Sequence, residues 1–200
     1  MKSYIKQEIA KSKELLARML ADDPLMTELE KIAHCCLAAI RSGGKVLFAG
    51  NGGSAADAQH LAAEFVSRFA FDRPGLPAFS LVTDSSVMTA IGNDYGFEHL
   101  FARQIQAVGV AGDVFVGIST SGHSPNILLA LAEARRKGLV AVGFTGESGG
   151  NMLDHCDLCI RIPSRETPRI QEGHIVLGHT LCGIIEQTLF PVQTGVNHAG

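Results

Sequence analysis

The first forty residues of the chain show the apolar spacing of two amphipathic helices. In residues 3–20 and in about 25–41, apolar side chains recur three or four positions apart, with polar ones between them. The segment "DDP" at 22–24 separates the two stretches, and "SGG" at 42–44 ends the second. The pattern therefore predicts that the chain opens with a helical hairpin, which we place at residues 1–43.

After this hairpin, short apolar runs alternate with stretches of helical spacing. Five runs are typical of buried strands: "KVLFAG", "PAFSLVT", "DVFVGIS", "LVAVGFTG" and "DLCIRIP". Helices are expected at about 54–69, 85–109 (in one piece or two), 124–137, 150–155 and 167–190. Strands that alternate with helices indicate βαβ units. We therefore predict an α/β fold, with a five-stranded parallel sheet and helices on both of its faces.

The length and composition of the chain fit one domain. It has 200 residues, of which 46% are hydrophobic and 18% charged, which is enough for one core and short for two. We divide this single domain into the hairpin (1–43), an α/β core with the last helix (44–190) and a loose tail (191–200).

The charge of the chain limits its partners. The formal net charge is -3 and no block of Lys or Arg is present, which argues against direct contact with nucleic acid or with an anionic membrane surface. The N-terminal "MKSYIKQEIAKSKELLARML" is charged and amphipathic, and no apolar run approaches the length that spans a membrane. We expect a cytoplasmic protein with no direct nucleic-acid partner and no membrane partner.

The five cysteines do not suggest a disulfide framework, because their number is odd and the chain has no secretory character. They are Cys35, Cys36, Cys156, Cys159 and Cys182. The segment "CDLC" at 156–159 leaves a redox or metal-binding interpretation open. That interpretation is disfavoured, because no second pair accompanies it and it lies in a strand-like run.

Two loops have the composition of anion sites. "GNGGSAADA" follows the first expected strand and "STSGHSPN" the third, and each leads into a helix. Glycines let the backbone approach a ligand, and a helix N-terminus offers free N–H groups. Either loop alone is equally an ordinary strand-to-helix turn, but together they carry many hydroxyl side chains. If the first and third strands are neighbours, both loops can grip one phosphate. These hydroxyl residues are Ser54, Ser119, Thr120, Ser121, Ser124 and the nearby Thr83.

A dinucleotide site is the alternative for the first loop. "GNGGSA" fits the G-x-G-x-x-A fingerprint, but a single match is weak. The acidic residue expected about 20 residues later to bind the ribose is missing, since Asp84 comes too late. The hydroxyl-rich second loop suits a monoester phosphate better.

The stretch "HLAAE" raises a second kind of chemistry. His60 and Glu64 are four residues apart, on one face of the helix that starts at the first loop. Gln171 and His179 repeat this spacing in the apolar last helix. The four side chains are a credible ligand set for Zn²⁺, a proton-transfer pair with its partners, or hydrogen-bonded core residues. His174 lies on another side of the last helix, where we expect a structural or surface role.

At these residues the chain resembles the phosphoheptose isomerase family, the sedoheptulose 7-phosphate isomerases of the sugar-isomerase (SIS) domain superfamily. The motifs are "GNGGSAADAQHLAAEF", "IGNDYGFEHLF", "GDVFVGISTSGHSPN" and "RIQEGHIVLGH". The likeness runs from the N-terminal helices to about Phe190. It implies a three-layer α-β-α sandwich with a flavodoxin-like sheet, a homotetramer, and active sites near subunit interfaces.

The resemblance also implies an activity. Members interconvert sedoheptulose 7-phosphate and D-glycero-D-manno-heptose 7-phosphate, the first step toward activated heptose for surface polysaccharides. Aldose–ketose isomerisation of this kind passes through an enediol, with Glu64 moving the proton between carbons and His179 serving the oxygens. One zinc ion per subunit is expected to polarise the carbonyl. Expected zinc ligands are His60, Glu64, Gln171 and His179.

Further positions match substrate contacts of the family. They are Asn51, Gly52, Gly53, Ser54, Glu64, Arg68, Asn93, Asp94, Ser119, Thr120, Ser121, Ser124 and Gln171. Pro168 departs from the family pattern, because some members carry an acidic residue there. This departure affects the expected sugar contacts and ring opening, not the reaction class.

A non-enzymatic branch of the superfamily is the alternative function. It shares the fold and the tetramer, and binds a replication initiator protein or senses a sugar phosphate. Its members are degenerate at the glutamate and at the last-helix histidine, whereas this chain has Glu64 and His179. The sequence therefore favours the isomerase.

Overall fold

The structure is a computed structural model, and it describes residues 1–191, so all but the first residue of the predicted tail (191–200) lies outside the described part. The strands are β1 (Val46–Gly50), β2 (Ala78–Ser80), β3 (Val114–Ile118), β4 (Val140–Gly146) and β5 (Leu158–Ile162). The helices are α1 (Lys2–Leu20), α2 (Asp23–Arg41), α3 (Gly53–Val66), α4 (Ser85–Asp94), α5 (Leu100–Val108), α6 (Pro125–Arg136) and α7 (Thr167–Leu189). Two short 3₁₀ helices are η1 (Phe97–His99) and η2 (Gly150–Asp154).

All five strands form one parallel sheet in the order β2-β1-β3-β4-β5. This is the flavodoxin-like order, in which β1 lies between β2 and β3 and the direction of winding reverses there. Val46 of β1 is in register with Val114 of β3. The predicted α/β class and flavodoxin-like sheet are confirmed, and the two predicted loops leave adjacent strands.

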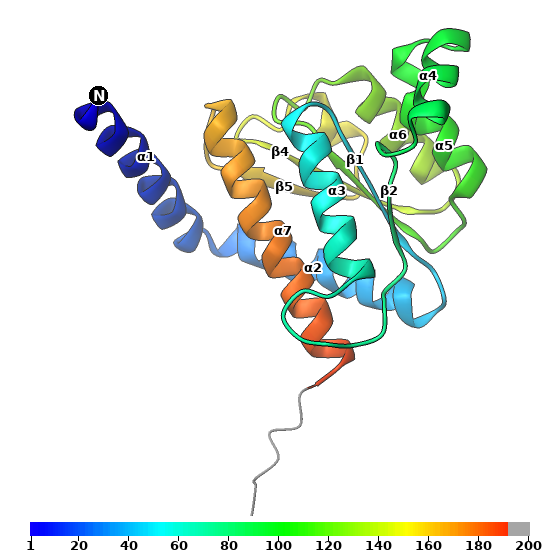
Figure 1. Cartoon of the computed structure of the whole chain (residues 1–200), viewed down its shortest axis with the longest axis horizontal. Helices are drawn as coiled ribbons and strands as arrows, with labels where there is room; N and C mark the ends of the chain where they lie inside the picture. Colours follow the sequence, from blue (N-terminus) through cyan, green and yellow to red (C-terminus); the bar gives the residue numbers. More distant parts are fainter. Residues whose placement is uncertain (192–200) are drawn as a thin grey trace, which may run out of the picture.

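Helices cover both faces of the sheet (Figure 1). One apolar core lies between the sheet and α2, α3 and α7, and a second lies between the opposite face and α5, α6 and η2. Every residue of β1 and β3 is buried, which explains why their sequences are apolar without alternation. The three layers leave the loops at the carboxyl ends of β1 and β3 free to form a site.

The N-terminal pair of helices is present, but α1 extends away from the body of the molecule (Figure 1). It buries only Leu15 and Met19 and is attached to α7, where Arg169 donates to the backbone carbonyl of Glu8 at 2.7 Å and to the Ser12 hydroxyl at 2.6 Å. The apolar residues of its predicted stripe are therefore exposed. They are Ile5, Ile9, Leu16 and Leu20, and Tyr4 beside them is exposed as well.

Some predicted boundaries shift for local reasons. The predicted helix at 85–109 divides into α4, η1 and α5, because Gly96 has a φ of 96° that ends the helical path. The predicted helix at 54–69 ends at Val66, and the strand predicted at 77–83 is paired only over Ala78–Ser80. Within residues 1–191, no helix is both long and apolar enough to cross a membrane.

Candidate active site

The helices α3 and α7 lie side by side and bring the two predicted pairs together (Figure 1). Glycine allows the close approach: a Cβ on Gly178 of α7 would lie 2.7 Å from the Leu61 side chain of α3. Toward the loops, a Cβ on Gly53 would overlap the side-chain amide of Gln171. The helices therefore run in the same direction, and both begin at the carboxyl edge of the sheet.

His60, Glu64 and His179 form one cluster. The Nε2 atoms of His60 and His179 are 2.8 Å apart, and His60 Nε2 lies 3.4 Å from Glu64 Oε1. Two unprotonated ring nitrogens at this distance repel each other, so a proton or a cation must lie between them. One donor atom from each of the three residues lies within 4.8 Å of the others. The structure thus brings His60 of the first predicted pair next to His179 of the second.

Asp57 is a neighbour of this cluster that the sequence interpretation missed. It lies three residues before His60 on α3, and its Oδ2 atom is buried with no hydrogen-bond partner. Burial raises the pKa of the Asp57 carboxyl, while the nearby His60 and His179 act in the opposite direction. The i, i+3 spacing in "DAQH" was the signal for it.

The donor set fits a divalent metal ion such as zinc. Two imidazole nitrogens and a carboxylate oxygen are typical zinc ligands, and the orphaned Asp57 oxygen is an additional acceptor beside them. Gln171, the fourth predicted ligand, is half-buried at the start of α7, where its amide lies against Gly53. The residues therefore fit the ion, with three of the predicted ligands gathered and Gln171 at the loop end of the same helix pair.

The two hydroxyl loops lie next to each other at the ends of β1 and β3. Gly52 has a φ of 57°, which favours glycine, and it caps α3. In the second loop the Ser119 and Ser124 hydroxyls are 2.9 Å apart, and the Ser121 hydroxyl accepts from the backbone N–H of His123. Ser54 and Ser119 are buried, and Thr120 is half-buried. Adjacent serines at two helix N-termini are suited to a phosphate group.

A pair of amides joins these loops. The Nδ2 of Asn51 donates to Asn126 Oδ1 at 2.9 Å, and the Nδ2 of Asn126 donates to Asn51 Oδ1 at 2.8 Å. Asn126 is 1% exposed, and the sequence interpretation had not singled it out.

Three predicted substrate contacts lie outside this cluster in the single chain. Asn93 and Asp94 are exposed at the end of α4, where the Nδ2 of Asn93 donates to Asp94 Oδ1. Helix α4 packs on η1 and α5, away from α3 and α7 (Figure 1). Arg68 is exposed just after α3. Whether these three contact substrate stays a prediction.

The end of α3 is held by a buried ion pair. Arg73 and Glu186 have side chains 2% and 1% exposed, with Nε of Arg73 3.0 Å from Glu186 Oε1. Glu186 also accepts from the backbone N–H groups of Phe69 and Ala70. The Phe69 ring lies 5.6 Å from the His179 ring. This network therefore orders the chain directly after Glu64.

His174 lies apart from the cluster, as its place on the helix had predicted. It is buried, and its Nε2 lies 3.1 Å from the backbone oxygen of Thr145. Burial lowers the pKa of His174 to about 4. It is therefore a structural residue.

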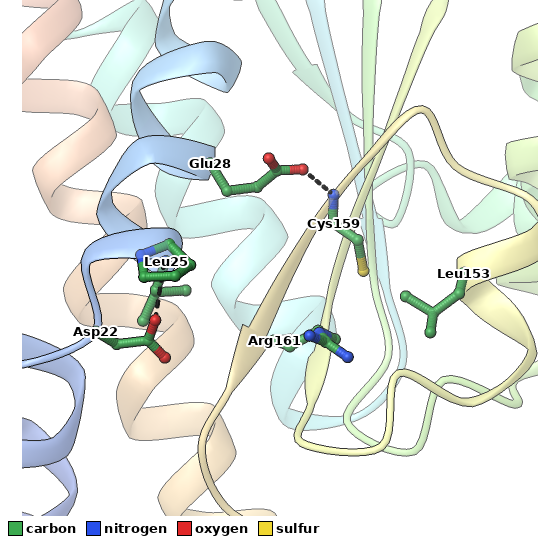
Figure 2. Close-up of a pocket in the computed structure, with 7 residues that line it drawn as sticks. Asp22, Leu25, Glu28, Leu153, Cys159 and Arg161 are labelled. Carbon is green, nitrogen blue, oxygen red and sulfur yellow. Dashed lines mark hydrogen bonds between the residues drawn. The ribbon is translucent and has the colours of Figure 1, made fainter.

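A pocket of about 300 Å³ lies elsewhere, between the start of α2 and the edge strand β5 (Figure 2). Glu28 reaches across it and accepts from the backbone N–H of Cys159 at 3.0 Å. Cys159 and Cys156 are free thiols. The Glu28 carboxylate accepts a hydrogen bond from a backbone N–H at the edge of the sheet, which would otherwise be available to another strand. None of the predicted site residues, all of which the structure describes, lines this pocket.

Comparison with known proteins agrees with this geometry. A family model described as the SIS domain matches residues 8–146. A phosphoheptose isomerase of Burkholderia pseudomallei (strain 1710b) is 60% identical over 191 residues, which cover 96% of this chain and 97% of that one. The phosphoheptose isomerase of Aneurinibacillus thermoaerophilus is 56% identical over 190 residues, covering 95% and 96%.

Solved structures give the same result. Phosphoheptose isomerase from Neisseria gonorrhoeae superposes with a TM-score of 0.87 at 39% identity, covering 93% of this chain and 98% of that one. A phosphoheptose isomerase from Francisella tularensis superposes with a TM-score of 0.87 at 36% identity, covering 92% and 97%. The likeness therefore extends over nearly the whole length of both chains.

Proposed function

Because the chain belongs to the SIS domain family and, within it, to the phosphoheptose isomerases of heptose biosynthesis, we propose that it interconverts sedoheptulose 7-phosphate and D-glycero-D-manno-heptose 7-phosphate. The observation that carries this proposal is the cluster of His60 and Glu64 with His179. The first two lie on α3, which begins in a phosphate-type loop, and His179 lies on the neighbouring α7. A phosphate held at the loops leaves the sugar carbons free to extend along α3 and α7 toward the cluster. The proposed reaction is the first step toward activated heptose.

In this reaction the chain's own residues move protons. Glu64 takes the proton from C1 of the ketose and returns it to C2, while His179 takes a proton from the oxygen on C1 and gives one to the oxygen on C2. No atom is gained or lost, as an isomerisation requires. His60, Glu64, Gln171 and His179 would hold zinc, and when bound the ion supplies Lewis-acid polarisation of the carbonyl.

The serine loops have the complementary role of binding. Ser54, Ser119, Thr120, Ser121 and Ser124 hold the phosphate, with Asn51, Gly52 and Gly53 at the first loop. Arg68, Asn93 and Asp94 contact the sugar chain. Phosphate binding far from the reacting carbons fixes the substrate's orientation, so part of the binding free energy serves the chemical step.

We further propose a homotetramer. The exposed apolar stripe of α1 supports it, because such a stripe is costly to leave in water. In a single chain, Asn93 and Asp94 lie away from the cluster on α3 and α7. In the proposed tetramer they would contact substrate in the site of another subunit.

The reaction is proposed to take place in the cytoplasm. All five cysteines are free in the structure, as expected for a reducing compartment. The proposed substrate is a phosphate ester, and its charge keeps it inside the cell.

The alternative of a non-enzymatic binding protein receives less support. The named relatives are isomerases, and the acid/base residues Glu64 and His179 are both present and adjacent to His60. A protein that only binds a partner has no need of this cluster.

Turnover of sedoheptulose 7-phosphate tests the proposal, followed by NMR of the product with added Zn²⁺ and with chelator. Glu64→Gln and His179→Gln should fold and lose activity by at least about a hundredfold. Glu30 and His34 of α2 repeat the spacing of four on an exposed face, so Glu30→Gln and His34→Gln are the matched controls and should remain active. Substantial activity in either site variant, or none in the unchanged chain, would overturn the assignment.

A further inference from the structure

The amide pair of Asn51 and Asn126 supplies the side-chain hydrogen bonds that join residues 51–54 to residues 119–126. The two residues are 75 positions apart. Asn51 directly follows β1 and Asn126 lies in the first turn of α6, the helix that follows the adjacent strand β3. Each amide both donates and accepts, so the two hydrogen bonds form a closed ring. A ring of this kind fixes the relative position and orientation of both side chains, which one hydrogen bond cannot do.

The surroundings make the pair more than an incidental contact. Asn126 is 1% exposed and belongs to the first turn of α6, directly after Ser124. Asn51 lies directly after β1, and its backbone carbonyl accepts from the backbone N–H of Ser54 at 3.0 Å. Asn51 is therefore tied to Ser54 by a backbone hydrogen bond, and Asn126 follows Ser124 by two residues in the chain. A buried amide without its partner would pay the full cost of desolvation.

We infer that Asn126 is a positioning residue, which acts through Asn51 to hold the two phosphate loops at the separation that one phosphate requires. The inference rests on the proposed function for the identity of the substrate. It changes the expected role of Asn51, whose side-chain oxygen and one N–H are engaged within the protein. Asn51 then serves phosphate binding by ordering its loop.

The choice of substitution separates positioning from mere packing. Asn126→Ala removes both hydrogen bonds. Asn126→Asp keeps the shape of the side chain. When protonated, the new carboxyl group can donate to Asn51 Oδ1 and accept from Asn51 Nδ2, as the amide does. An ionised carboxylate has no proton to donate, so one of its oxygens repels Asn51 Oδ1. The aspartate variant should therefore recover at low pH and the alanine variant should not.

The experiment measures KM and kcat for sedoheptulose 7-phosphate, and the Kd for inorganic phosphate by calorimetry, at about pH 5.5 and about pH 8, since burial raises the pKa of an aspartate. Elements packed against α6 carry the titratable side chains of Glu98 and His99 in η1 and the permanent charge of Arg103 in α5. Each variant is therefore compared with the unchanged chain at the same pH. Asn151→Asp, which places the same new charge on an exposed residue, is the matched control.

We expect Asn126→Ala to raise KM and the phosphate Kd about tenfold at both pH values, with kcat within about threefold, because the lost hydrogen bonds act on binding. Asn126→Asp should match it at the higher pH and return to within about twofold of the unchanged chain at the lower. An unimpaired Asn126→Ala, or equal impairment of both variants at every pH, overturns the inference. If the unchanged chain binds phosphate without turning over the sugar, the proposed function fails while the Kd values still decide the role of Asn126; if it does not bind phosphate, the inference fails as well.

Discussion

The guanidinium Nη2 of Arg73 donates a hydrogen bond of 2.8 Å to the backbone carbonyl oxygen of Glu64. A second nitrogen, Nη1, donates to the carbonyl of Phe65, and Nε donates to Glu186. The cation thus occupies the carbonyl end of α3, where the helix dipole favours positive charge. The backbone of the proposed proton-transfer residue is held by a side chain that has no chemical role of its own.

Removal of Glu186 should therefore be costly. Glu186→Gln leaves the Arg73 guanidinium buried without its carboxylate, and we expect the free energy of unfolding in urea to fall by about 3–5 kcal/mol. Glu147→Gln, in an exposed pair with Arg165, is the control and should cost less than about 1 kcal/mol. A loss of similar size in both variants would show that burial of the pair is not the cause.

The stability of the fold should also fall in acid through His174. Because burial lowers its pKa to about 4 from 6.5, the unfolded chain binds more protons between these values. The contribution is complete above pH 6.5 and is lost as pH falls to 4, which amounts to about 3 kcal/mol. His174→Asn keeps a donor for the Thr145 carbonyl and should show a smaller pH slope in urea unfolding. The exposed His34→Asn is the control, and an unchanged slope in His174→Asn would contradict this assignment.

Zinc should stabilise the folded chain. At a hundredfold excess over its Kd, an ion that binds only the folded state adds about 2.7 kcal/mol, which a thermal melt with and without Zn²⁺ measures as a rise in Tm. His60→Ala removes one of three gathered ligand atoms and should abolish the rise, whereas the exposed His34→Ala should keep it. An equal rise in both variants would place the ion elsewhere.

Substitution of Gly53 should lower the affinity for Zn²⁺ more than it changes the stability of the fold. A methyl group there meets the end of the flexible Gln171 side chain, which can move aside, and alanine is the better helix former. We expect Gly53→Ala to change the free energy of unfolding by less than about 1 kcal/mol and to weaken Zn²⁺ binding about tenfold or more in a chelator competition. Gly92→Ala, where the new methyl makes only ordinary contact with Leu100, should bind Zn²⁺ normally. Normal affinity in Gly53→Ala would argue against Gln171 as a ligand.

The stripe on α1 should decide the oligomeric state. Ile5 and Ile9 are 56% and 64% exposed, and the double substitution Ile5→Lys with Ile9→Lys places charge on the proposed interface. Light scattering after gel filtration should then give a mass below that of the tetramer, because buried unpaired charge opposes assembly. Ser3→Lys adds charge to the opposite side of the same helix and should leave the mass unchanged. A tetramer that survives the double substitution would exclude this face.

Local patterns account for what the sequence could predict. Within residues 1–191, apolar periodicity located the five strands and the helices, except that it did not show how 85–109 divides into α4, η1 and α5. The spacing of four paired His60 with Glu64, because this signal also lies within one element. A spacing of three, which also places residues on one helix face, would have reached Asp57 from His60. The partners of Asn51 and Arg73 were not predictable in this way, since Asn126 and Glu186 are brought to them by strand order and by the packing of α7 on α3. The sequence predicts that the two loops meet if the first and third strands are neighbours. It does not predict that Asn51 and Asn126 pair there.

The parallel pairing of α3 with α7 has a consequence for the order in which the chain matures. Residues 51–73 are synthesised before the residues they pair with: Asn126 pairs with Asn51, Gln171 lies against Gly53, His179 pairs with His60, and Glu186 pairs with Arg73. A nascent chain therefore carries the glycine loop and "HLAAE" first without Asn126, and then without the Gln171 and His179 of the proposed ligand set. The two phosphate loops can be joined once α6 has begun, but chemistry becomes possible only later, when α7 packs on α3.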